Sequence, residues 1–253
     1  MIFEDRARAG SFGVDAAQYD RARPGYPSEL FDDLLPDGKC SVVDVGCGTG
    51  IVARLLGERS CSVIGVEPDP RMAEIARGSG LTVEISTFEE WDSRGRVFDA
   101  LTAGQSWHWV NPAQGAEKTA AVLRPGGRFG VFWNGLRHDE DVAAGFERIY
   151  SRLAPQLLLD SVALGTARPS EDTAEPAFIH VGRFTRLQTH SYTWQRSYTT
   201  NAWLDELPTH SDHRTLPPHV LANVLEAVGE LIDGLGGEIV VHYTTAGLFG
   251  ERR

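Results

Sequence analysis

The sequence predicts an α/β fold, in which a doubly wound and mostly parallel sheet carries helices on both faces. Three observations support this fold class. Short β-branched runs alternate with amphipathic helical segments through the first half of the chain. A glycine-rich turn follows the first of these runs and leads into a helix. Strands that alternate with helices of about ten to fifteen residues indicate right-handed βαβ units.

The first half of the chain is expected to hold five strands, over residues 41–45, 61–66, 81–86, 98–103 and 127–134. The helix after the first strand, over residues 51–58, places its Ile, Val and Leu side chains on one face. Asp69 can cap the next helix. Pro112 can open the helix that the "RPGG" of residues 124–127 ends.

In the second half of the chain, strands and helices no longer alternate regularly. Residues 139–154 and 217–232 are expected to be helices, and residues 183–195 and 237–245 alternate like strands. Residues 155–182 have weak periodicity, which indicates an insertion over the sheet. These two strands bring the expected total to seven.

Composition narrows the classes of function. The 253 residues carry 24 basic and 35 acidic side chains, and this net charge of −11 argues against wide contact with nucleic-acid phosphates. No apolar run approaches the ~20 residues of a membrane helix, and "MIFEDRARAG" lacks a basic-then-apolar signal. Cys40, Cys47 and Cys61 have no C-x-x-C spacing and suit a reducing compartment. We therefore expect a cytoplasmic protein without nucleic-acid or membrane partners; its oligomeric state stays open.

The most specific stretch is "VVDVGCGTG", residues 42–50, in which Gly46, Gly48 and Gly50 alternate. Glycine lets the backbone turn sharply and approach a ligand. A dinucleotide site usually has G-x-G-x-x-G, with pyrophosphate at the helix N-terminus. Here the spacing is G-x-G-x-G, and the carboxylate of Asp44 would repel a pyrophosphate but attract an ammonium group. The turn thus predicts a nucleoside with a cationic amino-acid tail, which is S-adenosylmethionine.

Glu67 ends the second strand, 21 residues after Gly46, where an acid can accept both ribose hydroxyls. Dinucleotide-binding folds also have an acid that binds the ribose hydroxyls. Glu67 therefore indicates a nucleoside but does not distinguish S-adenosylmethionine from NAD(P). A Rossmann-type NAD(P)-dependent oxidoreductase therefore stays an alternative, as does a non-catalytic S-adenosylmethionine-binding protein. A nucleic-acid or protein methyltransferase is disfavoured by the charge and by the lack of an "NPPY"-like tetrapeptide after the fourth strand.

The motifs "DVGCGTG", "GVEPDP", "VFDALTA" and "VLRPGGRF" resemble, in order and spacing, those of class I S-adenosylmethionine-dependent methyltransferases, over about residues 38–135. Three further segments, "FGVDAAQYDRARPGYP", "SWHWV" and "THSDHRTLP", resemble a branch that acts on small molecules and includes trans-aconitate methyltransferases as distant relatives. The resemblance implies methyl transfer to a small-molecule acceptor, with S-adenosylhomocysteine as product. It leaves open whether an O, S, N or carboxyl atom is methylated.

The resemblance also implies a Rossmann-like sheet with its last strand antiparallel, in a single domain over residues 1–253. Its parts would be an N-terminal lid and helix (1–36), a cofactor-binding core (37–135), a cap insertion (136–182) and C-terminal strands and helix that complete the sheet (183–253).

Carried onto this sequence, the family pattern implies a cofactor site made by residues from five segments. The methionine part would be held by Asp44, Gly46, Cys47 and Gly48, and its end would lie beside Ala103 and Gln105. The ribose would be bound by Glu67, the adenine would lie beside Thr87 and Phe88, and Pro68 would form the rim of the pocket. In the lid, Tyr19 would lie near the sulfonium and Arg23 near the carboxylate. The sequence departs from the family at Thr87, where many members have an acid that binds the adenine amino group.

On the acceptor side, His108 has three interpretations: a structural histidine, a general base or substrate-orienting group, and a metal ligand. His210, in "HSDH", is a second candidate base; we expect no metal site there, because no further Cys or Glu completes a ligand set. The expected aromatic walls of the acceptor pocket are Trp107, Trp109, Trp133 and Tyr192. Proximity and orientation would supply most of the catalysis, and a base is needed only if the acceptor must lose a proton.

Overall fold

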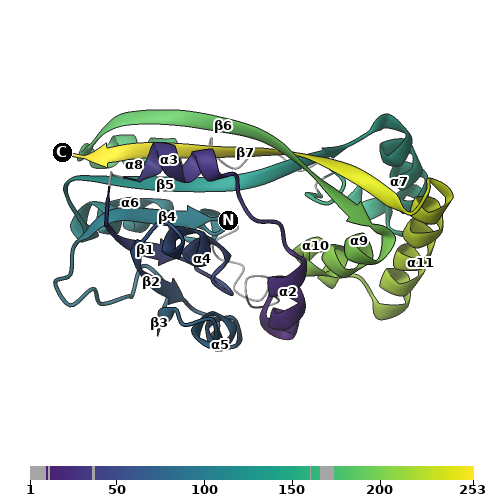
Figure 1. Cartoon of the computed structure of the whole chain (residues 1–253), viewed down its shortest axis with the longest axis horizontal. Coiled ribbons are helices and arrows are strands. Elements are labelled where there is room, and N and C mark those ends of the chain that lie inside the picture. Colours follow the sequence, from purple (N-terminus) through teal and green to yellow (C-terminus); the bar gives the residue numbers. More distant parts are fainter. Residues whose placement is uncertain (1–9, 11, 36–37, 160, 166–173) are drawn as a thin grey trace.

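The computed structural model describes residues 10, 12–35, 38–159, 161–165 and 174–253. Seven strands form one sheet in the order β3-β2-β1-β4-β5-β7-β6 (Figure 1). Their bounds are β1 Ser41–Val45, β2 Ser62–Glu67, β3 Thr82–Ile85, β4 Phe98–Gly104, β5 Leu123–His138, β6 Phe184–Thr199 and β7 Glu238–Arg252. The strands from β3 to β5 pair in parallel, and β7 is antiparallel to both β5 and β6. The predicted fold class is confirmed, including the antiparallel last strand.

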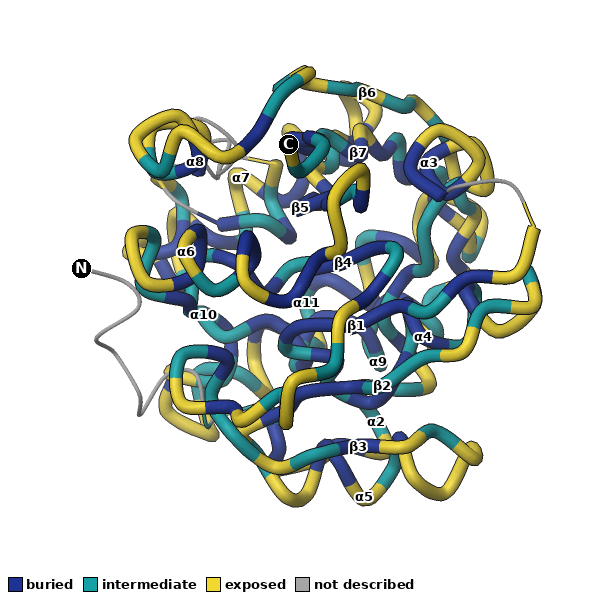
Figure 2. Tube along the Cα trace, turned by 90° about the vertical axis from the view of Figure 1, so that its left-hand side faces the viewer, coloured by how far each residue is buried: buried dark blue, intermediate teal, exposed yellow. Residues whose placement is uncertain are grey.

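Helices cover both faces of the parallel half. On one face, α6 (Pro112–Val122) and α8 (Glu175–Val181) enclose an apolar cluster with the strands; on the other lie α3 (Ser28–Leu34) and α4 (Ile51–Gly57). A fifth helix, α5 (Pro70–Gly78), packs beside β3. In Figure 2 the central strands β1, β2 and β4 are largely buried, whereas the outer turns of α5 are exposed.

Side-chain caps set the helix starts that the sequence indicates. The carboxylate of Asp69 accepts from the backbone N–H of Arg71, and Pro70 takes the first helical position of α5. Asn111 caps α6 in the same way through the N–H of Gln114. Both helices therefore begin just past a carboxyl end of the sheet, which is where open α/β sheets bind ligands.

The antiparallel half reaches beyond the predicted strands. β5, β6 and β7 all extend past the parallel strands because each pairs along its length with an antiparallel neighbour. This extension carries a second apolar core, around Trp203, Tyr198 and Tyr243. It is covered by α7 (Glu140–Leu153), α9 (Thr200–Glu206), α10 (Ser211–Arg214) and α11 (Pro218–Gly234), which we call the cap (Figure 1). Of these four helices only α7 lies in the expected cap insertion of residues 136–182; residues 136–138 continue β5, and α8 packs on the sheet.

The N-terminal segment forms a short 3-10 turn, η2 (Phe12–Asp15), and the helix α2 (Ala16–Ala22). In Figure 1, α2 lies between the α5 end of the sheet and the α9–α10 cap, and it contacts both α5 and α9. The predicted lid thus bridges the two halves of the molecule, apart from residues 1–9, 11 and 36, which lie outside the described residues. No helix within the described ranges is long and apolar enough to cross a membrane.

The structure pairs two of the three cysteines, which the sequence did not predict. Cys40 and Cys61 immediately precede the paired starts of β1 and β2 and form a disulfide, with Cα atoms 4.8 Å apart. The parallel register brings them together although they are 21 residues apart in sequence, a proximity that cysteine spacing alone does not reveal. Cys47 is free and buried, as an unpaired thiol in the glycine turn.

Candidate active site

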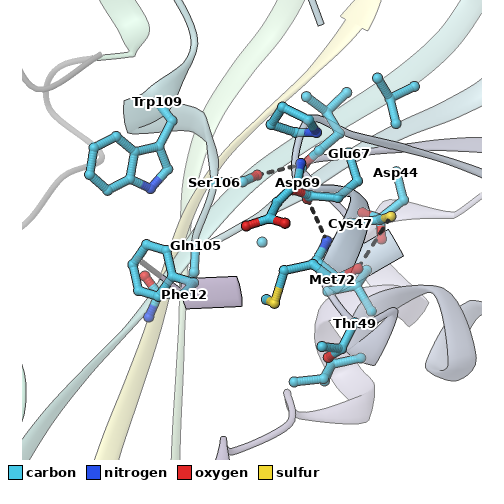
Figure 3. Close-up of a pocket in the computed structure, with 18 of the residues that line it drawn as sticks. Phe12, Asp44, Cys47, Thr49, Glu67, Asp69, Met72, Gln105, Ser106 and Trp109 are labelled. Carbon is cyan, nitrogen blue, oxygen red and sulfur yellow. Dashed lines mark hydrogen bonds between the residues drawn. The ribbon is translucent and has the colours of Figure 1, made fainter. Parts of the chain in front are cut away.

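A pocket opens at the carboxyl ends of β1, β2 and β4, and the lid segment covers it (Figure 3). Its empty volume is about 1120 Å³ with the open solvent at its mouth included. The predicted residues that line it are Tyr19, Arg23, Asp44, Gly46, Cys47, Gly48, Glu67, Pro68, Thr87, Phe88, Gln105 and Trp109.

The glycine turn is held against the sheet. The backbone N–H groups of Gly46 and Cys47 both donate to the carbonyl of Val66, at 2.7 and 3.2 Å. Gly46 has φ 61°, and a Cβ there would lie 2.6 Å from the Cβ of Ser106. Ser106 is itself fixed, because its hydroxyl donates to the carbonyl of Val45 at 2.6 Å. Only glycine fits this position, both for its backbone conformation and for the space.

Asp44 lies buried at the end of β1, beside this turn. Its Oδ1 accepts from the hydroxyl of Thr102 at 2.7 Å, whereas its buried Oδ2 has no hydrogen-bond partner in the described part of the chain. Burial raises the pKa of Asp44 to about 7, because the carboxylate is removed from water without a cation. An ammonium group in the pocket would satisfy Oδ2, so Asp44 fits the amino-acid end of S-adenosylmethionine.

Glu67 ends β2 with its carboxylate oriented by the backbone. Oε2 accepts from the N–H of Gly48 and Oε1 from the N–H of Asp69, both at 2.9 Å (Figure 3). Burial also raises the pKa of this carboxyl to about 7. Each carboxylate oxygen can accept more than one hydrogen bond, so the oxygens can still receive a pair of ribose hydroxyls.

The region after β3 holds an acid that the sequence analysis missed. Thr87 and Phe88 line the pocket as expected, and the hydroxyl of Thr87 contacts Glu90. Glu89 also lines the pocket, and its Oε1 accepts from the N–H of Asn111 at 2.7 Å. The signal was present in "TFEEW", where an acid stands two positions after the expected one.

The segment predicted as a lid packs directly against the start of α5. A Cβ at Gly13 would lie 2.1 Å from Oδ2 of Asp69, so the turn η2 rests on the start of α5. Arg71 adds a hydrogen bond from its Nη2 to the carbonyl of Gly10, at 2.7 Å. The ring of Phe12 stands edge-on to Trp109, with centroids 6.2 Å apart, across the pocket from Glu67 (Figure 3). Phe12 and Gly13 were not predicted as site residues.

His108 lies beside the pocket lining and not in it. Its Nδ1 accepts from the indole N–H of Trp133 at 3.0 Å, which assigns the imidazole proton to Nε2. Its ring also packs against Trp109, with centroids 4.9 Å apart. Of the three interpretations, the structural one agrees best with this geometry, because the lone pair that a base would use is engaged.

His210 is buried beneath the lid and does not line the pocket. Its Nε2 lies 2.8 Å from the carboxylate of Glu206, and Arg23 contacts the same ring. The structure therefore places His210 behind Arg23 and away from any acceptor in the pocket. No group of three or more His, Cys, Asp or Glu side chains within the described ranges could hold a metal ion.

Four other predicted residues lie elsewhere. Trp107 is buried against Phe178 on the α6 face of the sheet, and Ala103 lies within the same apolar cluster. The hydroxyl of Tyr192 donates to Asp33, away from the pocket. Trp133 points to the opposite face from Asn134, because neighbours on a strand alternate.

Asn134 takes the place that was expected of Trp133 in the pocket lining. Its Nδ2 donates to the carbonyl of Gly25 in the lid at 3.0 Å, and its Oδ1 accepts from the hydroxyl of Thr245 at 2.6 Å. The side chain of Gln105 donates to the Asn134 carbonyl. Asn134 therefore connects the lid with the central sheet.

Comparison with known proteins gives matches across most of the chain. Residues 43–131 match the protein family described as "Methyltransferase domain". An uncharacterized methyltransferase of Mycobacterium tuberculosis is 33% identical over 237 residues, which cover 92% of this chain and 89% of that protein. A ubiquinone biosynthesis O-methyltransferase of Methylocella silvestris is 32% identical over 93 residues, 34% of this chain and 36% of that protein.

Two solved structures share the fold. A protein of Anaeromyxobacter dehalogenans assigned as a type II methyltransferase superposes with a TM-score of 0.67 at 22% identity, over 90% of this chain and 97% of that one. Phosphoethanolamine N-methyltransferase 2 of Haemonchus contortus, in complex with S-adenosyl-L-methionine, superposes with a TM-score of 0.53 at 14% identity, over 95% of this chain and 56% of that one.

Proposed function

Because the chain belongs to the S-adenosylmethionine-dependent methyltransferases, we propose that it methylates a small molecule by alignment, without a histidine base. The observation that carries the proposal is the composition of the pocket. It holds an unpartnered buried carboxylate oxygen on Asp44 for the cofactor, and none of its described lining residues is a histidine or a lysine.

The cofactor contacts follow from the carboxylates. Asp44 would bind the ammonium group of the methionine part, and the backbone turn at Gly46 would let that part approach the sheet. Glu67 would accept the ribose hydroxyls, while the adenine would lie between Phe88 and the lid. When bound, the cofactor supplies a methyl group that is already activated by its sulfonium. The ring of Tyr19 could stabilise that positive charge by roughly 0.5–2 kcal/mol.

A small acceptor is supported by the way the pocket is covered. The lid rests on α5 and reaches α9, so an acceptor must fit in the space that remains beneath Phe12 and Trp109. A long nucleic-acid strand would also meet an acidic protein, with a net charge of −11. Both features favour a small molecule.

A mechanism without a protein base is supported by the placement of both candidate histidines. His108 is hydrogen-bonded by Trp133, and His210 is enclosed by Glu206 and Arg23. The chain would then align the acceptor behind the methyl group and exclude water from both partners. Acceptors that already carry a free lone pair at neutral pH, such as a carboxylate, a thiolate or an uncharged amine, suit this mechanism.

The test is a screen for S-adenosylhomocysteine release over carboxylates, thiols, amines, phenols and heterocycles, with calorimetric binding of S-adenosylmethionine and NAD⁺ in parallel. We expect binding of S-adenosylmethionine alone, and turnover with at least one acceptor class at an unchanged rate in His108→Gln. Binding of NAD⁺ in its place would contradict the proposal. Cofactor binding without turnover over the whole panel would favour a non-catalytic S-adenosylmethionine-binding protein.

A further inference from the structure

Behind the lid, a charged side chain of the pocket is tied to two buried residues of the cap. Nη1 of Arg23 donates to Oε1 of Glu206 at 3.3 Å and lies 3.1 Å from Nδ1 and 3.0 Å from Nε2 of His210. Nε2 of His210 lies 2.8 Å from the same Glu206 carboxylate. We call these three residues the Arg23 cluster. Neither Glu206 nor His210 lines the pocket, whereas Arg23 does.

The cluster is largely shielded from water. The side chains of Arg23, Glu206 and His210 are 12%, 1% and 5% exposed. Burial alone would raise the pKa of Glu206, but His210 and Arg23 hold it below its ordinary value. Burial lowers the pKa of His210 below its ordinary value; the carboxylate of Glu206 opposes this effect, and the positive charge of Arg23 adds to it. The cluster therefore packs a guanidinium, a carboxylate and an imidazole directly against one another.

All of these contacts involve one nitrogen of the guanidinium, Nη1. Nε and Nη2 of Arg23 have no hydrogen-bond partner among the described residues. The guanidinium is planar and presents its donors as a rigid fork, so fixing Nη1 also fixes the direction of the other N–H groups. Two parallel N–H donors are the geometry that binds a carboxylate most strongly.

The neighbouring residue strengthens the link between lid and cap. Asp205 accepts from the side chain of Gln18 at 3.1 Å and from both Nε and Nη2 of Arg21 at 2.8 Å. Consecutive residues at the end of α9 thus bind three side chains of the lid segment. The cap holds the lid close to the pocket, and within that contact Glu206 and His210 set the direction of Arg23.

We propose that Glu206 and His210 are positioning residues that aim Arg23 at the amino-acid carboxylate of the cofactor. The inference rests on the proposed function, because that carboxylate belongs to S-adenosylmethionine and S-adenosylhomocysteine. A long arginine side chain loses rotamer freedom when it binds a ligand. In this protein the contacts with Glu206 and His210 already restrict the rotamers of Arg23. The cofactor carboxylate would therefore bind Nε and Nη2 donors that are oriented before it arrives.

The experiment compares two ligands by calorimetry. S-adenosylhomocysteine carries the amino-acid carboxylate, and 5′-methylthioadenosine has the same nucleoside without the amino-acid tail. For Glu206→Ala and His210→Ala we expect the Kd of S-adenosylhomocysteine to rise about tenfold, as for the loss of one well-oriented charged contact. The Kd of 5′-methylthioadenosine should stay within about twofold, and Glu206→Gln should restore most of the affinity because its amide oxygen can still accept from Arg23.

The matched control is Tyr150→Phe, which breaks a buried hydrogen bond of 2.7 Å to His213 in the same cap; among the described residues Tyr150 makes no hydrogen bond to the Arg23 cluster. It should lower thermal stability and leave both affinities unchanged. Equal weakening of both ligands in Glu206→Ala and His210→Ala would assign the cluster a purely structural role and overturn the inference. Unchanged or tighter S-adenosylhomocysteine binding would also overturn it. Failure of the wild-type protein to bind S-adenosylhomocysteine at all would instead refute the proposed function.

Discussion

At the scale of single residues, the site depends on two carboxyl groups whose pKa values are raised by burial. Asp44 and Glu67 both have a pKa of about 7 in the free protein. A bound ammonium and bound hydroxyls favour the ionised forms. We therefore expect cofactor binding to be coupled to the release of protons from these two groups.

This coupling predicts the pH dependence of affinity. Because the pKa values fall on binding, the bound protein holds fewer protons, and affinity decreases as pH falls through 7. Between pH 8 and pH 6 we expect the Kd of S-adenosylhomocysteine to rise by about tenfold for each carboxyl group. Calorimetry in buffers of different ionisation enthalpy should show proton release near pH 7. An affinity that does not change over this range, or proton uptake, would contradict the assignment.

Glu67 offers a direct substitution test. In Glu67→Ala the ribose would lose both acceptors, and Gly48 and Asp69 would lose the carboxylate that orders their N–H groups. We expect cofactor affinity to fall at least about tenfold, which corresponds to about 1.4 kcal/mol. Glu67→Gln, which keeps one acceptor oxygen, should lose less. Wild-type affinity in Glu67→Ala would remove the ribose assignment.

A substitution at His108 distinguishes a structural role of this histidine from a catalytic one. His108→Gln keeps a side chain that can accept from Trp133, and it removes the titrating imidazole. We expect kcat/KM within about threefold of wild type at every pH from 6 to 9, since a lost general base would cost about 100-fold or more. A large fall, greatest where the imidazole would be neutral, would restore His108 as the base.

At the scale of elements, the lid is the part whose position depends most on one small residue. Gly13→Ala would put a Cβ 2.1 Å from Oδ2 of Asp69 and push η2 away from α5. We expect weaker cofactor binding, by about fivefold or more, and faster proteolysis of the lid, because contacts that exclude water from the pocket are lost. Gly25→Ala, in the same segment, is the control, since a Cβ there meets nothing within 4 Å. If both variants bind equally well, lid packing does not govern the site.

The sequence predicts the elements that local patterns define. The turn at Gly46, the acid at Glu67, the cap of α5 and the start of α6 at Pro112 are encoded within a few residues, and the structure places them as expected. The extended β5, β6 and β7 were underestimated because their lengths depend on mutual pairing, which no single segment encodes. Trp133 was assigned to the pocket on composition, although strand alternation turns Asn134 there in its place. The contact between Arg23 and Glu206 joins residues 183 positions apart, beyond the reach of any local pattern.

At the scale of the whole molecule, we expect a single cooperative domain in spite of its two apolar cores. The strands β5, β6 and β7 run from the first core into the second, and α2 joins the α5 side of the sheet to α9. The pocket lies where these connections meet, with lining residues from the lid, the glycine turn and the end of β5. A ligand bound there should therefore stabilise both halves together.

Thermal unfolding tests this expectation. At a free S-adenosylhomocysteine concentration 100 times its Kd, mass action should add about 2.7 kcal/mol to the free energy of unfolding. For a chain of this size each 1 kcal/mol shifts Tm by about 2–4 °C, so we expect one transition that moves up by roughly 5–10 °C. NAD⁺ at the same concentration should leave Tm unchanged. One transition is expected because the lid and the cap are joined through Asp205 and Glu206, so neither can unfold without loss of the ligand's binding energy. Two resolved transitions, of which only one responds to the ligand, would contradict this and show that the cap unfolds independently of the site.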